Sequence, residues 1–478
     1  MRVARSSRAR ASCVTGCLVR LMIVLLLIGL AALVIFTVIL VREEQITPEI
    51  VDGLPDAASD ARAAFGQASV VPPGDERPGG LLVFTTRGDA SNFVLSYLDG
   101  DPLALLWESD KLDMSDESAP LPPAIGDETV YLAEGTRLHA LDLTDGERRW
   151  SAELSAAIPP GCASCIQPLA GAVAVLTEDQ TLQVLSADDG EPLWQTALNT
   201  LPRELYLLEG SPAAIDTLPE SDSSALIVFD ALSGVERKRF EPRCTPDGVA
   251  ETLNPGSPVL VDPASGAIYF LFGFTQHGCA QRWDLTTGEM VWSASFPLQT
   301  SGWPRSWMTV APLLGDDAIY LAGAEGAAIL ALDTADGTLR TLVRSTSHTL
   351  KPWALAGGTL LVRAEQLDSL DEDELWGIAL PDGEQLWDYP IKRDNSSWTA
   401  HRAPGGFVVI QLVPDPPRLR VTLLDTLDGA PLRERVLAAS AAAWTGTTWS
   451  DDTAWLTIGA LYRVDLDTGR PYEVWPPR

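Results

Sequence analysis

The chain has 478 residues, of which 46% are hydrophobic and 21% are charged, and 15 are Trp. This composition supports a large buried core and excludes a disordered protein. The formal net charge is −31, and a surface this acidic repels phosphate backbones, so nucleic acid is excluded as a partner.

The first predicted element is a transmembrane helix over residues 21–41, LMIVLLLIGLAALVIFTVILV. These 21 uncharged residues are enough, as a helix, to cross a bilayer core about 30 Å thick. Residues 1–20 form a basic tail with five Arg and no acidic residue, which the positive-inside rule places in the cytoplasm. No small-x-small cleavage pattern ends the apolar segment, so an uncleaved signal anchor is favoured over a removed signal peptide. We therefore expect a single-pass protein of the cytoplasmic (inner) membrane, with the remainder of the chain outside the cytoplasm.

Residues 42–79 are rich in Pro, Gly, Ala and charged residues and predict a flexible stalk. Residues 80–478 then repeat one hairpin pattern nine times, at steps of 40 to 54 residues. Such a period is typical of repeat folds. The first turn positions are Asp99, Asp142, Ser186, Asp230, Asp284, Asp333, Ala379, Asp425 and Asp465.

The residues that recur in the hairpin have structural roles. Eight copies carry Gly four residues after the first turn position, where a short loop requires positive φ, and the first copy has Leu103 instead. The Asp side chain is expected to accept backbone N–H bonds across the turn, a structural role. Eight residues after it, five copies carry Trp, which we expect to wedge between neighbouring sheets. These are Trp107, Trp150, Trp194, Trp292 and Trp387; the other copies have Lys, Thr, Arg and Glu.

Two further short apolar runs precede each hairpin, which gives four strands per unit and hardly any helical pattern. This arrangement predicts an all-β fold, a β-propeller of four-stranded blades. The pattern LxALDxxTGExxW resembles the repeat of quinoprotein-like propellers, also called PQQ-like repeats. That family includes quinoprotein alcohol dehydrogenases and the propeller lipoprotein of the outer-membrane β-barrel assembly machinery, both with eight blades. The resemblance implies eight blades, and the nine hairpins keep nine as the alternative.

The resemblance to quinoprotein dehydrogenases would imply an adjacent Cys pair, Ca²⁺ ligands and a catalytic Asp. Cys162 and Cys165 are not adjacent, and the remaining ligands find no match in this chain. We therefore expect no catalytic residue, no cofactor and no metal, and keep a quinone-cofactor oxidoreductase as an alternative.

Four cysteines follow the predicted anchor, and an even set outside the cytoplasm indicates two disulfides. Cys244 follows the fourth strand of one unit and Cys279 lies between strands two and three of the next, so both belong to one face of adjoining blades. We expect Cys244 to pair with Cys279 and Cys162 with Cys165. A zinc site formed by all four thiolates, or a redox role for the CASC motif, are the alternatives.

A candidate ligand face comes from a second periodicity. Trp307, Trp353, Trp398 and Trp444 recur at steps of 46, 45 and 46 residues, at or just before the innermost strand of each unit. Basic residues are nearby in sequence, namely Arg305, Lys351, Arg402, His348 and His401. This set predicts an aromatic, locally basic mouth of the central channel, and packing between blades is the alternative.

The sequence as a whole favours a membrane-anchored, non-enzymatic propeller that presents a loop-rich face to a protein or another ligand. An envelope-assembly role, by analogy with the family lipoprotein, is weakened because no lipobox cysteine follows the apolar segment.

Overall fold

The computed structural model describes residues 49–51, 63–73, 79–86, 93–99, 103–112, 121–219, 223–248, 250–272, 277–297, 311–323, 326–367, 372–392, 397–441, 444–450 and 452–475. The chain divides into residues 1–49 and 50–478, and the account below concerns the second unit. The predicted basic tail and transmembrane helix lie outside the described residues. Within the described ranges, no helix is long and apolar enough to span a membrane.

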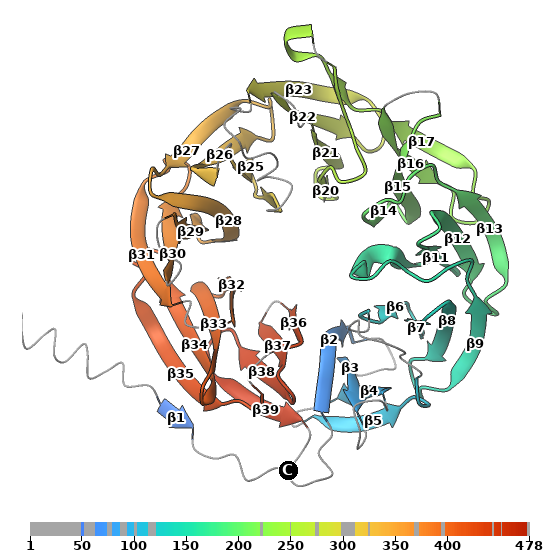
Figure 1. Cartoon of the computed structure of the whole chain (residues 1–478), viewed down its shortest axis with the longest axis horizontal. Helices are drawn as coiled ribbons and strands as arrows, with labels where there is room; N and C mark the ends of the chain where they lie inside the picture. Colours follow the sequence, from blue (N-terminus) through green and yellow to red (C-terminus); the bar gives the residue numbers. More distant parts are fainter. Residues whose placement is uncertain are drawn as a thin grey trace, which may run out of the picture. The chain divides into compact units, whose positions relative to one another are not determined.

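Nine four-stranded antiparallel sheets follow one another along the described chain and form the blades of a propeller (Figure 1). Blade one contains β2 (Ala63–Val71), β3 (Gly80–Thr86), β4 (Phe93–Asp99) and β5 (Ala104–Glu108). Blade two contains β6 (Ala124–Ile125), β7 (Thr129–Glu134), β8 (Arg137–Asp142) and β9 (Arg148–Glu153). Blade three contains β10 (Ile166–Leu169), β11 (Ala172–Leu176), β12 (Thr181–Ser186) and β13 (Pro192–Ala197). Blade four contains β14 (Leu205–Leu208), β15 (Ser211–Thr217), β16 (Ser224–Phe229) and β17 (Glu236–Phe240). Blade five contains β20 (Val259–Asp262), β21 (Ala267–Phe272), β22 (His277–Asp284) and β23 (Met290–Pro297). Blade six contains β24 (Leu313–Leu314), β25 (Ala318–Ala322), β26 (Ala328–Asp333) and β27 (Leu339–Arg344). Blade seven contains β28 (His348–Ala356), β29 (Thr359–Gln366), β30 (Glu372–Ala379) and β31 (Gln385–Lys392). Blade eight contains β32 (Ser397–Ala403), β33 (Gly406–Pro414), β34 (Pro417–Asp425) and β35 (Pro431–Ala438). Blade nine contains β36 (Gly446–Trp449), β37 (Thr453–Thr457), β38 (Leu461–Asp465) and β39 (Pro471–Trp475).

Five short elements complete the description. The sheet of blade eight has a fifth strand, β1 (Glu49–Val51). A two-stranded insertion, β18 (Arg243–Cys244) and β19 (Glu251–Thr252), stands between blades four and five with the 3-10 turn η2 (Pro246–Gly248), and a second 3-10 turn, η1 (Ala163–Cys165), precedes blade three.

The number of blades corrects the sequence-based expectation of eight. The first unit is complete because β2 supplies its innermost strand, so each of the nine hairpins belongs to its own blade. β2 lies inside residues 42–79, which the sequence assigned to the stalk, and the first blade therefore begins before residue 80. Its short apolar stretches are interrupted by Gly66 and carry no repeat signature, which is why the pattern missed it.

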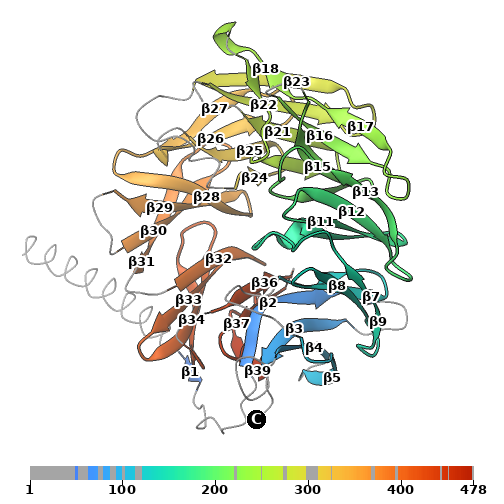
Figure 2. The same ribbon diagram turned by 45° about the vertical axis from the view of Figure 1, so that its right-hand side comes forward.

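The middle strands of each blade are buried on both faces. Every residue of β16 and of β11 is buried, while the outermost strand β13 alternates between exposed and half-buried residues. Continuous apolar runs are stable only where both sheet faces are covered. Neighbouring blades provide that cover, and Figure 2 shows them packed side by side around the ring.

The hairpin turns behave as the sequence predicted. In eight blades the Gly N–H donates to the carbonyl of the first turn residue at 2.8 to 3.2 Å. Six Asp side chains also accept backbone N–H bonds within their own turns, as when Asp142 Oδ1 accepts from Thr144 N at 2.7 Å. These Asp residues are structural.

The five Trp residues connect consecutive blades. Each indole N–H donates to the backbone oxygen that follows the first turn residue of the next blade, at 2.9 to 3.1 Å. The pairs are Trp107 with Leu143, Trp150 with Ala187, Trp194 with Ala231, Trp292 with Thr334, and Trp387 with Thr426. The expected wedge is thus confirmed, and it carries a hydrogen bond that the repeat did not reveal.

The ring closes where the first blade meets the last. Ala64 N donates to Gly459 O at 3.1 Å, Gly66 N donates to Thr445 Oγ1 at 3.1 Å, and the Thr457 hydroxyl donates to Gly66 O. Leu81, Leu98 and Leu461 are buried together behind these contacts. Each blade is built from strands that are consecutive in sequence, so closure is by packing and hydrogen bonds across this seam.

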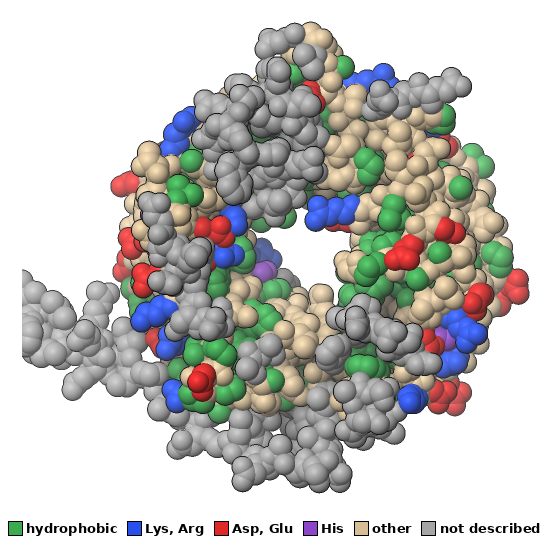
Figure 3. Space-filling view, in the orientation of Figure 1, with side chains coloured by type: hydrophobic (Ala, Val, Ile, Leu, Met, Phe, Trp, Pro, Cys, Tyr) green, Lys and Arg blue, Asp and Glu red, His purple; other side chains and the backbone are tan. Residues whose placement is uncertain are grey.

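Alternating strand direction gives the ring two distinct faces. We call the loop face the one that carries the connections between blades and the loops between second and third strands. The turn face carries the other turns, including the repeated hairpins. The innermost strands lie nearest the centre of the ring (Figure 1), and a central opening is present there in the space-filling view (Figure 3).

Candidate functional site at the mouth of the central opening

Basic side chains are present around the central opening. Figure 3 shows Lys and Arg side chains on opposite sides of its rim, although the chain is strongly acidic. Ligand sites are typically concave and mostly apolar, with a few polar groups that fix the orientation of the ligand.

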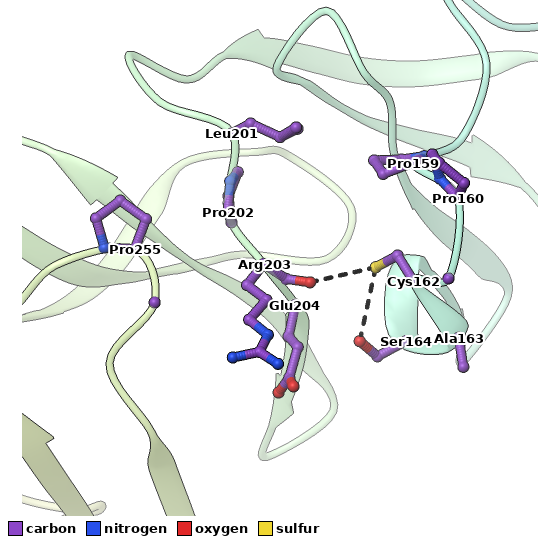
Figure 4. A pocket seen from close by; sticks show the side chains of 12 residues that line it. Pro159, Pro160, Cys162, Ala163, Ser164, Leu201, Pro202, Arg203, Glu204 and Pro255 are labelled. Atoms are coloured by element: carbon purple, nitrogen blue, oxygen red, sulfur yellow. Dashed lines mark hydrogen bonds between the residues drawn. The ribbon is translucent and has the colours of Figure 1, made fainter. Parts of the chain in front are cut away.

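A cavity of about 700 Å³ is located on the loop face beside this opening. Its walls are the three loops that lead into the innermost strands β10, β14 and β20 of blades three, four and five. We call it the mouth cavity; its lining includes Pro159, Pro160, Cys162, Leu201, Pro202, Arg203, Glu204 and Pro255 (Figure 4). Proline fixes backbone φ and thus limits the motion of each wall.

Hydrogen bonds hold these loops in place. Asp216 accepts from Asn199 N at 2.7 Å and from Asn199 Nδ2 at 2.9 Å, which fixes the start of the second loop. Asn254 Oδ1 accepts from Gly256 N at 3.0 Å in the third loop. The first loop contains a disulfide between Cys162 and Cys165. The cavity is therefore largely formed before any ligand arrives, which lowers the entropy cost of binding.

The charges in the mouth cavity come from two adjacent residues. Arg203 is exposed, and among the described residues no carboxylate forms an ion pair with it. Glu204 lies next to it, and burial together with the Glu204 carboxylate raises the pKa of Tyr206, so this phenol is neutral. The cavity therefore combines an apolar, proline-rich wall with one guanidinium and one carboxylate from adjacent residues.

The second disulfide joins Cys244 in β18 to Cys279 in β22. It ties the insertion between blades four and five to blade five, and Gln281 Nε2 donates to Arg243 O at 2.7 Å beside it. The insertion accounts for the longest step of the repeat. Both disulfides are those expected from the sequence.

Two residues of the predicted ligand face lie together between blades seven and eight. The rings of Trp353 and Trp398 are 5.1 Å apart between centroids, and the Arg363 guanidinium lies 4.8 Å from the Trp398 ring. Trp353 Nε1 donates to Ala400 O in the neighbouring blade at 2.8 Å. These contacts make the pair part of the packing between the two blades.

Lys351 belongs to a charged network beside this pair. Its Nζ lies 2.6 Å from Glu365 Oε1, and Arg363 lies 3.1 Å from the same carboxylate and 2.8 Å from Asp373. Asp373 is completely buried. The sequence pattern did not reveal Arg363 and Asp373; the available signal was the presence of charged residues in the second and third strands of a blade, β29 and β30.

The other predicted face residues lie apart. Arg402 is near the far end of β32 and lines a cavity of about 810 Å³ on the turn face with Asp316, Asp317 and Arg340. Trp444 packs against the core between blades eight and nine.

The two histidines of the set have aromatic neighbours. His401 stacks on Trp449 with centroids 4.4 Å apart, and His348 meets the Trp376 ring edge-on at 5.0 Å. Trp307 and Arg305 lie outside the described residues, and the ligand face as a whole remains a prediction.

The described residues contain no group of three or more His, Cys, Asp or Glu side chains arranged to hold a metal ion. Cys162 and Cys165 are joined to each other with two residues between them. What the described part of the chain does present is a channel mouth with rigid loops and a disulfide.

The fold, the repeat and the hairpin chemistry together define a nine-bladed β-propeller of PQQ-like repeats. Residues 91–269 and 276–448 match the family model described as outer membrane protein assembly factor BamB, and the chain belongs to that family. No curated protein matches the chain in sequence.

Several solved structures resemble the chain in fold. BamB from Moraxella catarrhalis is 14% identical, with 84% of this chain and 94% of that chain covered and a TM-score of 0.42. The computationally designed Ika8 protein is 15% identical, with coverage of 75% and 98% and a TM-score of 0.44. The quinohemoprotein alcohol dehydrogenase ADHIIG from Pseudomonas putida HK5 is 14% identical, with coverage of 77% and 68% and a TM-score of 0.41.

Proposed function

We propose that this propeller is a non-enzymatic binding module, held outside the cytoplasm by one transmembrane anchor, that takes a segment of a partner protein at the mouth cavity. The observation that carries the proposal is the cavity itself. Three proline-containing loops and the unpaired Arg203 converge on it, and its walls are fixed by hydrogen bonds. An exposed apolar residue at its edge, Leu201, offers the contact around which such interfaces form.

The anchor rests on the apolar segment 21–41 and the five Arg before it. Two disulfides support a compartment outside the cytoplasm, because structural disulfides persist mainly in oxidising environments. A reporter active only outside the cytoplasm should therefore work when fused after Val41. Activity only from a reporter that requires the cytoplasm would contradict the topology.

The binding site is tested by crosslinking in the native membrane. A photo-crosslinking amino acid at position 201 should capture a specific protein, whereas the same group at Val235, exposed in a hairpin on the turn face, should not. Arg203→Glu should abolish the capture. Arg433→Glu is the matched control, because Arg433 is also exposed but lies on the outer strand β35. Equal capture from positions 201 and 235, or no effect of Arg203→Glu, would sink the proposal.

A role in envelope assembly is the second candidate. It is favoured by the family match, whose description is an outer membrane assembly factor. The identity of the captured protein decides it: an envelope-assembly component would support this role.

A further inference from the structure

The disulfide in the mouth cavity differs in position from an ordinary structural cross-link. Cys162 lines the cavity and its Sγ points toward the backbone oxygen of Arg203, 3.5 Å away (Figure 4). Cys165 is completely buried and does not line the cavity. Cys162 is only 8% exposed but lies at the cavity wall, whereas Cys165 has no exposed surface, and this asymmetry directs attack to Cys162.

This disulfide also contributes little to holding the ring together. It spans three positions in sequence, whereas Cys244–Cys279 spans 35, and closing a short loop restricts the unfolded chain much less than closing a long one. The loop keeps other supports: Cys165 N donates to Cys162 O at 3.2 Å, and Gln167 Nε2 donates to Ser164 O at 3.1 Å. We therefore expect reduction of Cys162–Cys165 to leave the fold intact.

The surroundings suit a free Cys162. The Arg203 carbonyl is in place to accept a hydrogen bond from a thiol at this position.

From this geometry we propose that Cys162–Cys165 is a thiol–disulfide exchange site for dithiol substrates that enter the mouth cavity. A substrate thiolate attacks Cys162 Sγ and forms a mixed disulfide, while Cys165 leaves as a thiolate and takes a proton from water. The second substrate thiolate attacks the substrate sulfur of the mixed disulfide and releases Cys162. The substrate loses two electrons and becomes a disulfide, and the two cysteines gain those electrons.

The exchange does not depend on the capture of a partner protein. Arg203→Glu tests capture and the cysteine variants test exchange, so either proposal can fail alone.

The first test uses the full-length protein in detergent, titrated with mixtures of reduced and oxidised dithiothreitol. Free thiols are alkylated and the two cysteine pairs are counted by mass spectrometry, so Cys244–Cys279 serves as an internal control. Cys162–Cys165 should be reduced at a reduced-to-oxidised ratio about 100-fold lower than Cys244–Cys279, with an unchanged circular dichroism spectrum. Reduction of both pairs together, or of Cys162–Cys165 only in denaturant, would overturn the proposal.

The second test compares two single variants. Cys165→Ser leaves Cys162 at the cavity, and Cys162→Ser leaves Cys165 in the core. With oxidised glutathione the first variant should form a mixed disulfide at least about 10-fold faster. Equal rates in two folded variants would show that the asymmetry does not exist.

Discussion

The indole of Trp150 lies against Gly190 of the next blade, so close that a β-carbon on Gly190 would be 2.6 Å from Trp150 Cε3. The same indole donates to Ala187 O at 2.9 Å. Position 190 therefore requires glycine for two reasons: the backbone adopts a positive φ of 73°, and the Trp150 ring occupies the space of a β-carbon. The repeat conserves this arrangement in five interfaces, where Trp and Gly come from different blades.

The effect of the positive φ and the effect of the Trp150 contact can be measured separately with a matched pair of variants. Gly210 has the same φ of 73° but open space around its α-carbon. Gly210→Ala should cost about 1 to 2 kcal/mol for the left-handed backbone alone. Gly190→Ala should cost about 1 to 3 kcal/mol more, because the ring must move. Urea unfolding of both variants measures the difference, and equal losses of stability would show that the ring contact is unimportant.

Lys238 occupies the Trp position in blade four, and its ammonium donates to Leu285 O, the carbonyl that an indole would use. Gly288 in the next blade has open space where the ring would lie. Lys238→Trp should therefore fill this interface and raise the free energy of unfolding by about 1 to 2 kcal/mol. Thermal and urea unfolding check this. Lys238→Met, which leaves the Leu285 carbonyl without its donor, should lower stability; stabilisation by Met and not by Trp would contradict the interpretation.

Asp373 is the buried member of the charged network in blade seven, 2.8 Å from Arg363. Asp373→Asn keeps the shape and removes the charge, which leaves Arg363 with only the shared Glu365 carboxylate. The loss should be about 3 kcal/mol, since breaking a buried pair is costly. Glu434→Gln, in the more exposed pair with Arg420, should cost less than about 1 kcal/mol. Similar losses in the two variants would show that burial does not strengthen the first pair.

His139 is almost fully buried, with Nδ1 2.7 Å from Ser151 Oγ and Nε2 2.6 Å from Glu134 Oε2. Burial is the largest influence and lowers the pKa of His139, opposed by the Glu134 carboxylate. Between the folded and unfolded pKa values, His139 therefore binds a proton in the unfolded chain but not in the folded chain. The stabilising effect is fully present above a pH of about 6.5, the unfolded pKa, and is lost as the pH falls below it toward the folded pKa.

The prediction is a decrease in the free energy of unfolding between pH 7.5 and pH 5.5 that is smaller in His139→Gln. The pKa of His401 is also lowered, mainly by burial, so His401→Gln should remove a separate part of the slope. Urea unfolding at several pH values measures both. A histidine that titrates above its ordinary pKa by NMR would reverse the sign and refute the argument.

Local chemistry explains how far the sequence predicted this fold. The Asp and Gly of each hairpin act within their own turn, so their roles were predicted correctly from Asp142 and Gly146. Trp107 acts on the next blade, and the sequence predicted its wedge but not its acceptor, which depends on how blades are rotated against each other. The pairing of Arg363 with Asp373 depends on strand register, which the repeat does not encode.

The candidate ligand face shows the same limit. Trp353 packs on Trp398 and donates to Ala400 O in the neighbouring blade, whereas Arg402 follows Ala400 in β32 and lines the cavity on the turn face. A step of about 45 residues specifies which strand a residue is on, but not its height along the channel.

The seam between β2 and β36 has a consequence for how this chain can be rearranged. Every blade is a self-contained length of polypeptide, and the seam differs from the other eight interfaces mainly in being without a covalent connection. Joining the ends and cutting at any loop between blades should thus yield a circular permutant with the same ring, in which the old seam is an ordinary connection. Whole units are likewise suitable modules for duplication or deletion, so a change in the number of blades needs no redesign of the blade.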